Sequence, residues 1–286
     1  MSTTPAIPPE YTALVDDAAI FPPGEAPLEE AVPAHREHLA ARYAGMVGPF
    51  VVSDTRLPDL AGLVDPDGDP LRVTVVVTGG AGAIEPAYRW ATSPGLEPAG
   101  IEVALRDLDD LAGSARRVVA AVTQLGTDVP TYVEPPLVPG TPAHGWLAAL
   151  DEVASADLRL KLRTGGVTAD AFPSEETVAT AIDAALDREL PFKCTAGLHH
   201  AVRHRSGETG FEHHGFLNVL LATRAALDGD DVVAALAERD ADAVVSRLVD
   251  VGSDGLVRAR RWFTSFGCCG VREPYDDLVA LSLVPA

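Results

Sequence analysis

Lysine is almost absent from this chain of 286 residues: the 22 basic residues include only Lys161 and Lys193, so the other 20 are arginines. Arginine stays charged and cannot act as a nucleophile. A lysine that is desolvated, or that lies beside another cation, can lose its proton and form a Schiff base. A GC-rich coding bias is the plain alternative, but both surviving lysines lie inside short apolar runs, which indicates a retained chemical role.

Cysteine is also scarce, with Cys194 and the adjacent pair Cys268 and Cys269. An odd number that includes two neighbours is not a disulfide framework. It is typical of a reducing compartment. The first nine residues lack the basic region and apolar core of a signal peptide. We therefore expect a cytoplasmic protein.

Long hydrophobic runs and positive charge are lacking too. No window of 18 uncharged apolar residues occurs, so we expect no membrane span. The net charge of −20 would repel nucleic-acid phosphate and anionic lipid. The expected partner is therefore a small-molecule substrate, with neither nucleic acid nor membrane, and a homodimer is an assembly that a protein of this size often forms.

What the sequence does contain is a regular alternation of short apolar runs and segments of helical periodicity, which predicts an α/β fold with parallel strands. The expected strands are Thr12–Ile20, Pro49–Ser53, Arg72–Thr78, Ile101–Leu105, Val129–Val133, Leu158–Leu162, Pro191–Cys194 and Arg261–Phe266. Eight strands in about 250 residues favour a (β/α)8 TIM-like barrel over an open, doubly wound sheet. We expect a flexible N-terminus over residues 1–10 and a single barrel domain over 11–286.

Helices are expected between these strands and after the last of them. They are 27–44, Leu57–Val64, Ile84–Ala91, Leu108–Leu125, Gly145–Ala154, a segment that begins after the N-cap Ser174, Phe216–Leu227, Asp231–Leu236, Ala241–Val249 and Asp276–Leu283.

Functional residues of parallel barrels gather where the strands end. The ends of the expected strands carry Asp16, Asp17, Ser53, Asp54, Arg56, Thr78, Arg106, Asp107, Glu134, Lys161, Arg163, Thr164, Lys193, Thr195, His199 and His200. A purely structural role can explain individual residues of this set, since Asp107 could cap the next helix and Arg106 could pair with Glu134. Such a role fits the lysines less well, because a charge inside an apolar run is costly unless it is paired or neutralised.

Two lysine segments carry a resemblance to a known family. Leu-Lys-Leu-Arg-Thr-Gly-Gly (160–166) and Phe-Lys-Cys-Thr-Ala-Gly-Leu (192–198) are similar to the paired lysine strands of class I aldolases of the deoxyribose-phosphate aldolase type. The resemblance covers residues 157–200 and implies a (β/α)8 barrel. It also implies that Lys161 is the Schiff-base nucleophile, that Lys193 is the cation that lowers its pKa, and that Asp107 is a candidate acid/base.

The segments also depart from that family. Arg163 stands where the family has a small residue, and the histidines after Gly197 differ from its phosphate-binding turn, so we do not expect a phosphorylated sugar. The Lys-x-Arg-Thr-Gly-Gly segment is similar to barrel phosphoribosyltransferases as well. The substrate is therefore expected to be a small carbonyl compound, with proton transfer by Asp107, Glu134, His199 or His200. The residues expected to bind it are Asp16, Asp17, Arg106, Arg163, Thr164, Thr195, His214 and Asn218.

Five of the eight histidines lie between positions 199 and 214. His200 and His204 are four residues apart and share one face if this stretch is helical, and with His213 they form an alternative site for a divalent metal such as Zn. A polar loop rich in glycine is the plain alternative. A lid or a general acid/base is the other reading of this segment.

Four functions remain open. The first is a lyase that forms a Schiff base and needs no cofactor. The second is a metal-dependent hydrolase or lyase built on His199–His214. The third is a non-catalytic ligand-binding barrel. The fourth, which depends on the Lys-x-Arg-Thr-Gly-Gly segment alone, is a barrel that transfers a phosphoryl or ribosyl group. Adjacent Cys268 and Cys269 do not match a standard zinc spacing and predict a tight turn after the last strand.

Overall fold

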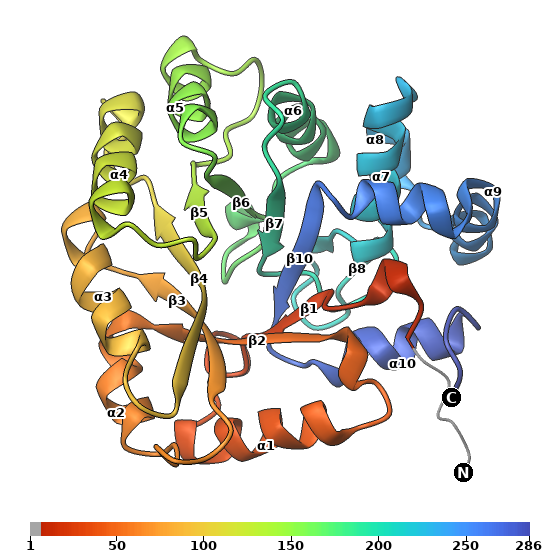
Figure 1. The fold of residues 1–286 in the computed structure, drawn as a ribbon. Helices are drawn as coiled ribbons and strands as arrows, with labels where there is room; N and C mark the ends of the chain where they lie inside the picture. Colours follow the sequence, from red (N-terminus) through yellow and green to blue (C-terminus); the bar gives the residue numbers. More distant parts are fainter. Residues whose placement is uncertain (1–6) are drawn as a thin grey trace.

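Eight parallel strands close into a barrel in the computed structural model, which describes residues 7–286 (Figure 1). The strands are β1 (Val15–Asp17), β2 (Val47–Ser53), β3 (Leu71–Val77), β4 (Leu96–Ala104), β5 (Thr131–Glu134), β6 (Arg159–Arg163), β7 (Phe192–Thr195) and β10 (Phe263–Cys268). Their order around the barrel is β1-β10-β7-β6-β5-β4-β3-β2. The predicted TIM-like barrel is confirmed, and the open sheet is not formed.

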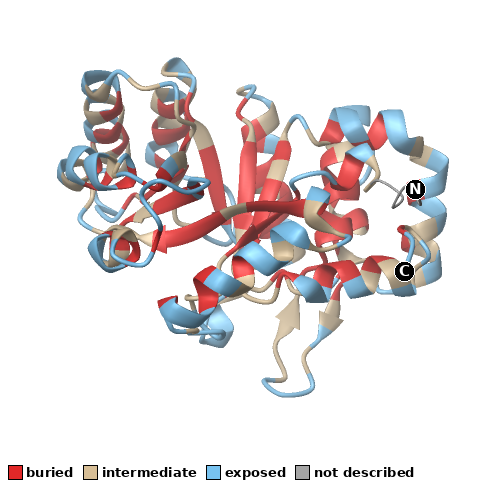
Figure 2. Ribbon diagram, turned by 60° about the horizontal axis from the view of Figure 1, so that its bottom comes forward, coloured by how far each residue is buried: buried red, intermediate tan, exposed pale blue. Residues whose placement is uncertain are grey.

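Helices cover the outside of the barrel. They are α1 (Leu28–Ala40), α2 (Leu57–Ala61), α3 (Ile84–Ala91), α4 (Leu111–Leu125), α5 (His144–Ser155), α6 (Glu175–Leu186), α7 (Phe216–Asp228), α8 (Val232–Ala237), α9 (Ala241–Ala259) and α10 (Arg272–Ala280). Figure 2 shows the strands almost entirely buried and the outer faces of the helices exposed. This two-sided burial is why the strands read as nearly continuous apolar runs.

Strand β3 illustrates how sequence determines these elements. Its residues Leu-Arg-Val-Thr-Val-Val-Val are mostly β-branched, a composition that suits a pleated strand with two buried faces. The helix α4 begins where Asp110 accepts a hydrogen bond from the Gly113 backbone N–H at 2.8 Å. It ends at Gly126, whose φ of 63° lies in the left-handed region. Both are standard helix boundary signals.

Several boundaries differ from the sequence expectation. The first strand is only Val15–Asp17, α9 runs ten residues further than expected with a kink at Gly252 (φ 68°), and α10 begins at Arg272. A short antiparallel hairpin of β8 (His204–Arg205) and β9 (Glu212–His213) lies between β7 and α7, so His200 and His204 do not share the face of a helix; the hairpin projects from the barrel in Figure 2. In the part of the chain that the structure describes, no helix is long and apolar enough to cross a membrane.

The N-terminal end of the barrel is closed by a short 3-10 helix, η1 (Pro9–Tyr11), and by Arg260. The Arg260 guanidinium donates to the Glu10 and Phe263 carbonyl oxygens, each at 2.9 Å. Glu10 is thus held in place and buried, whereas the sequence suggested a flexible segment through residue 10; Pro9 is exposed, and residues 1–6 of that segment lie outside the described range.

Candidate functional site

The two lysines lie side by side inside the barrel. Lys161 on β6 and Lys193 on β7 are direct register partners, and their exposed fractions are 3% and 1%. Successive side chains of a strand point to opposite faces. Leu160 and Leu162 therefore face the helices, while Lys161 faces the axis. The ion pairs of both lysines reach strands that are not their neighbours in the sheet, so they must cross the interior.

One carboxylate joins the two ammonium groups. Glu102 on β4 places Oε2 at 2.6 Å from Lys161 Nζ and Oε1 at 2.6 Å from Lys193 Nζ. Glu134 at the end of β5 adds a contact of 3.0 Å to Lys161 Nζ, and Asp16 on β1 pairs with Lys193. We call these five residues the lysine network.

The lysine network carries three carboxylates and two ammonium groups. A third cation balances it at the open end of the barrel, where Arg163 Nε lies 2.7 Å from Glu134 Oε1. The Arg163 side chain is 48% exposed, in contrast to the buried lysines. At the other end of the network, the Ser265 hydroxyl donates to Asp16 Oδ2 at 2.9 Å. The ion pairs therefore form a continuous chain from the buried lysines, through Glu134, to the solvent-facing guanidinium of Arg163.

The charges and the burial of the lysine network shift the pKa values of its residues. Burial acts to raise the pKa of Glu102, but the ion pairs with Lys161 and Lys193 outweigh it and lower the pKa to about 2. Burial acts to lower the pKa of Lys193, and Asp16 and Glu102 together raise it above its ordinary value. Burial raises the pKa of Asp16, and the nearby Glu102 carboxylate adds to the rise, while the ion pair with Lys193 opposes it.

A small residue makes room for this arrangement. Gly48 on β2 faces Asp16, and a Cβ built at Gly48 would lie 2.2 Å from Asp16 Oδ1. On β5, two residues before Glu134, Tyr132 places its ring centroid 5.3 Å from Lys193 Nζ, a cation–π distance. The Tyr132 hydroxyl accepts a hydrogen bond from Arg159 at 3.1 Å. Polar and aromatic side chains thus flank the lysine network on the side where Tyr132 and Arg159 lie.

Several residues expected from sequence meet at this network. Lys161, Lys193, Glu134 and Asp16 belong to it, and Arg163 contacts it. Two further expected residues lie at the ends of the lysine strands. Thr195 faces the interior beside Gly267, while the hydroxyl of the buried Thr164 donates to the Ala196 carbonyl oxygen at 2.7 Å and so holds the two strand ends together.

Other expected residues lie elsewhere. Asp17 points outward, to the His35 ring of α1 at 2.9 Å, because it follows Asp16 on the same strand. Arg106 and Asp107 are exposed beyond the end of β4, and Asp107 pairs with Arg117 at 3.2 Å. The structure therefore does not bring Asp107 to the lysines, as the aldolase resemblance implied, and the β4 carboxylate that reaches them is Glu102.

Two more expected binding residues serve the packing of the loop and helix that follow β7. The Asn218 side chain is buried and joins the Arg203 backbone N–H at 2.8 Å to the Ala235 and Glu238 carbonyl oxygens. His214 is buried between Arg203 and the Pro173 carbonyl oxygen. Neither side chain has a free polar atom to offer to a substrate.

Sequence reasoning missed Glu102, Tyr132 and Ser265. The signal for Glu102 was available: it is a charge in the middle of the apolar run Ile101–Leu105, the same feature that marked the lysines. Tyr132 and Ser265 carried no such signal, since a tyrosine and a serine are common in buried strands. Their role depends on the register of strands that are far apart in sequence.

The histidine segment forms two separate groups. The rings of His200 and His204 are 4.7 Å apart between centroids, and those of His204 and His213 are 5.2 Å apart. His200 also contacts Asp277 of α10 at 3.1 Å. Among residues 7–286, however, the group of three donors that converge closely enough for a metal ion is not this expected set. It consists of His199, Cys268 and Glu273.

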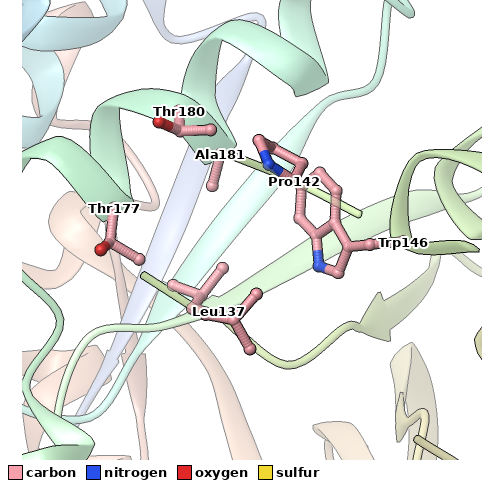
Figure 3. A pocket seen from close by; sticks show the side chains of 7 residues that line it. Leu137, Pro142, Trp146, Thr177, Thr180 and Ala181 are labelled. Atoms are coloured by element: carbon pink, nitrogen blue, oxygen red, sulfur yellow. The ribbon is translucent and has the colours of Figure 1, made fainter. Parts of the chain in front are cut away.

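A small hollow lies outside the barrel, between α5 and α6 (Figure 3). Its lining is largely apolar, with Trp146 on one side and Thr177 and Thr180 on the other. The Trp146 indole N–H already donates to the Pro136 carbonyl oxygen at 2.8 Å. The hollow contains no titratable side chain, so it offers shape but no acid, base or nucleophile.

The lysine network is the described part of the chain in which buried titratable groups are most densely connected. It combines two primary amines with three carboxylates, which can accept or donate protons, and with a guanidinium at the open end. Neither a scan against protein-family models nor a search of curated proteins finds a match for this chain.

Proposed function

We propose that this chain is a barrel enzyme that acts on a small carbonyl compound through a Schiff base on Lys161, as a lyase of the aldolase type. The observation that carries the proposal is the pairing of the only two lysines of the chain, both buried and bridged by the single carboxylate of Glu102. Charged groups inside a barrel are costly to bury. Two amines that share one buried site are therefore a strong indication of chemistry.

Lys161 is the better nucleophile of the two. Lys193 is bound by Asp16 and Glu102, both deeply buried, and its pKa is raised, so it remains an ammonium ion. Lys161 has Glu134 as its second partner, and Glu134 is linked to the half-exposed Arg163. A carbonyl compound that enters from the open end would meet Lys161 first.

The proposed reaction begins with transfer of one proton from the Lys161 ammonium group to Glu134. The free amine then attacks the carbonyl carbon, and one of its protons passes to the oxygen to give a hydroxyl group. This hydroxyl leaves as water after Glu134 returns the first proton to it. The resulting iminium ion keeps the positive charge that Lys161 had, so Glu102 and Lys193 retain their ion pair. The iminium withdraws the electron pair of the neighbouring carbon–carbon bond, which breaks as a hydroxyl group on the departing fragment becomes a carbonyl and yields its proton to a carboxylate.

Arg163 indicates the kind of substrate. Its guanidinium lies at the solvent-facing end of the network and holds Glu134 with a single nitrogen, Nε. The remaining donors suit a carboxylate or another anionic group on the substrate. We propose a small oxo acid or hydroxy-oxo acid rather than a phosphorylated sugar.

Reductive trapping tests the proposal. Sodium borohydride added with a panel of small aldehydes, ketones and oxo acids should fix one substrate fragment per chain, and peptide mass mapping should place it on Lys161. The chain suits this experiment, because only Lys161, Lys193 and the terminal amine can react. Lys161→Met should abolish the internal adduct, whereas Arg36→Met, which removes an exposed cation, should not. An adduct on Lys193 alone, or none across the panel, would contradict the proposal.

A second function is favoured by a different observation. The lysine network satisfies its own charges, as expected of a non-catalytic ligand-binding barrel whose lysines are structural. In that case Lys161→Met and Lys193→Met would lower stability and abolish no reaction. The metal-dependent alternative built on His200, His204 and His213 predicts a bound ion in protein purified without added metal, which elemental analysis detects.

A further inference from the structure

Three side chains from distant parts of the sequence meet at the rim of the barrel. His199 follows β7, Cys268 ends β10, and Glu273 lies in the first turn of α10. One donor atom from each lies within 4.8 Å of the other two. The His199 Nδ1 atom is the common point, 2.8 Å from Glu273 Oε2 and 3.7 Å from Cys268 Sγ. Neither the histidine set expected from sequence nor the lysine network includes any of these contacts.

The chemistry of the donors matches a particular class of ion. Imidazole nitrogen, thiolate sulfur and carboxylate oxygen together are the ligands that zinc uses in tetrahedral sites. Magnesium and calcium prefer oxygen ligands alone. A thiolate and a carboxylate supply two negative charges, which a divalent cation neutralises. The 3.7 Å between His199 Nδ1 and Cys268 Sγ is of the size expected for two ligands of one ion at about 2.0 to 2.3 Å, and the shorter 2.8 Å contact to Glu273 would widen as the ion replaces that hydrogen bond.

The surroundings are arranged around the same three donors. Gly270 lies in the turn between Cys268 and Glu273, and a Cβ built there would lie 2.7 Å from the Glu273 carboxylate. A larger residue would therefore displace this ligand. On the other side of the imidazole, His199 Nε2 lies 3.9 Å from Cys269 Sγ. With Nδ1 on the metal, the Nε2 proton points toward this sulfur, and such a partner fixes the tautomer and the ring orientation of a metal-bound histidine.

We propose that His199, Cys268 and Glu273 bind one zinc-like divalent cation, with a fourth position left for water. Binding releases the Cys268 thiol proton to solvent. The ion joins the segment after β7, the end of β10 and the start of α10. Cys268 on β10 is the register partner of Asp17 on β1, whose side chain faces α1. Cys268 therefore also faces outward, and the ion lies at the rim of the barrel wall rather than among the interior lysines. The proposal therefore stands independently of the Schiff-base reaction.

Cobalt binding tests this site directly. Metal-free protein, prepared with a chelator under reducing conditions, should bind one Co(II) per chain and show a thiolate-to-cobalt charge-transfer band together with the visible bands of tetrahedral cobalt. Cys268→Ser should abolish the charge-transfer band. His199→Gln and Glu273→Gln should weaken binding at least about tenfold, judged from the loss seen even when partners of ligands are removed.

Control variants separate this site from its neighbours. His200→Gln removes an adjacent histidine that contacts Asp277, and it should leave both the cobalt affinity and the charge-transfer band unchanged. Cys269→Ala removes the partner of His199 Nε2, so it should weaken binding but keep the band, because Cys268 supplies the thiolate. Lys161→Met should keep the band too, whatever happens to Schiff-base trapping. Zinc should raise the thermal midpoint of the wild-type chain and not that of Cys268→Ser, because binding to the folded state alone is stabilising.

Three results would overturn the proposal. The first is a wild-type chain without the cobalt band. The second is a band that survives Cys268→Ser but disappears in Cys269→Ala. The third is a bound ion that is lost in His200→Gln and retained in His199→Gln, which would assign it to the other histidine group.

Discussion

Glu102 is the single side chain on which the interior depends most. Each of its oxygens contacts a different ammonium group, and the residue is 2% exposed. A buried ion pair contributes little net stability compared with apolar residues of the same size, but removal of one partner leaves an uncompensated charge in a dry site. Substitution of one charged residue of the lysine network should therefore lower the stability of the fold more than replacement of all five residues by apolar side chains.

The substitution Glu102→Gln should therefore destabilise the chain by about 3 to 5 kcal/mol, measured as the free energy of unfolding in urea. A matched control lies on the same strand, where Glu97 pairs with Arg72 at 3.5 Å and both side chains are more than half exposed. Glu97→Gln should change stability by about 1 kcal/mol or less. Equal effects of the two substitutions would show that the network is not energetically coupled.

The same carboxylate makes stability depend on pH. The pKa of Glu102 in the folded chain is about 2, below its ordinary value of 4.5, so its contribution is fully present above pH 4.5 and is lost as the pH falls toward 2. Asp16 has a raised pKa and acts in the opposite sense, because burial favours its protonated, uncharged form. Lys193 has a raised pKa, so its contribution persists at all pH values below 10.5.

Urea titrations at several pH values check this expectation. The wild-type chain should lose stability between pH 4.5 and 2 more steeply than Glu102→Gln, and the difference between the two curves isolates this carboxylate. Parallel curves for the two proteins would contradict the lowered pKa.

At the scale of the element, the barrel strands are shaped to admit the polar interior. Gly48 shows this on β2, where the missing side chain leaves room for the Asp16 carboxylate. The neighbouring register is irregular as well: Val15 pairs with Val47 but Asp17 pairs with Phe50, so one extra residue of β2 lies between these pairs. Such a bulge redirects side chains locally. The glycine and the bulge together bring Asp16 to Lys193.

The substitution Gly48→Ala should overpack this point. A Cβ at 2.2 Å from Asp16 Oδ1 requires movement of a charged group held by Lys193 and Ser265. We expect a loss of about 1 to 3 kcal/mol in unfolding free energy. Gly145→Ala is the control, since it lies in α5 with no heavy atom within 4 Å of the new Cβ, and there alanine should be neutral or stabilise by up to about 1 kcal/mol. A neutral Gly48→Ala would mean that Asp16 has another favourable position.

The sequence was informative about elements because each barrel strand is buried on both faces and reads as an apolar run. It was less informative about what lies between them. The β8–β9 hairpin contains four paired residues, two of them histidine, in a stretch rich in glycine and charge, and such a stretch has no period that distinguishes a strand from a loop. Asp107 was expected at the lysines from the aldolase resemblance and from its place after the β4 run, whereas that strand turns Glu102 inward and leaves Asp107 in solvent.

At the scale of the whole molecule, acidic charge predominates, and most of it lies outside the buried core. The net charge is −20, and the sequence pI is about 4.6. Self-repulsion among surface carboxylates destabilises a compact chain, and salt screens it: the Debye length falls from about 30 Å at 0.01 M to about 8 Å at 0.15 M. The buried network is screened much less.

The thermal midpoint at pH 7 should therefore rise when NaCl increases from about 0.01 to 0.15 M. The same titration near pH 4.6 serves as the control, because the chain carries little net charge there and the midpoint should hardly move. A midpoint that falls with salt at pH 7 would show that attractive surface pairs outweigh the repulsion.

The number and order of barrel strands could be predicted because length and eight apolar runs leave few arrangements. The site could be predicted only in part. Lys161, Lys193 and Glu134 lie on strands adjacent in both sequence and space, so their meeting followed from the fold. Asp16 and Glu102 reach the lysines across the interior, and this depends on strand tilt and on a bulge that no local pattern indicates.

The direct pairing of Lys161 with Lys193 limits how the chain can change in length. Loss of one residue from Arg159–Arg163 would rotate the amine of β6 out of the interior and set it against the helical layer, with Leu160 or Leu162 turned inward. The same loss within 187–191, the connection that leads into β7, leaves both amines where they are. Insertions and deletions should therefore accumulate in the connections of this barrel, while the lengths of β6 and β7 stay constant.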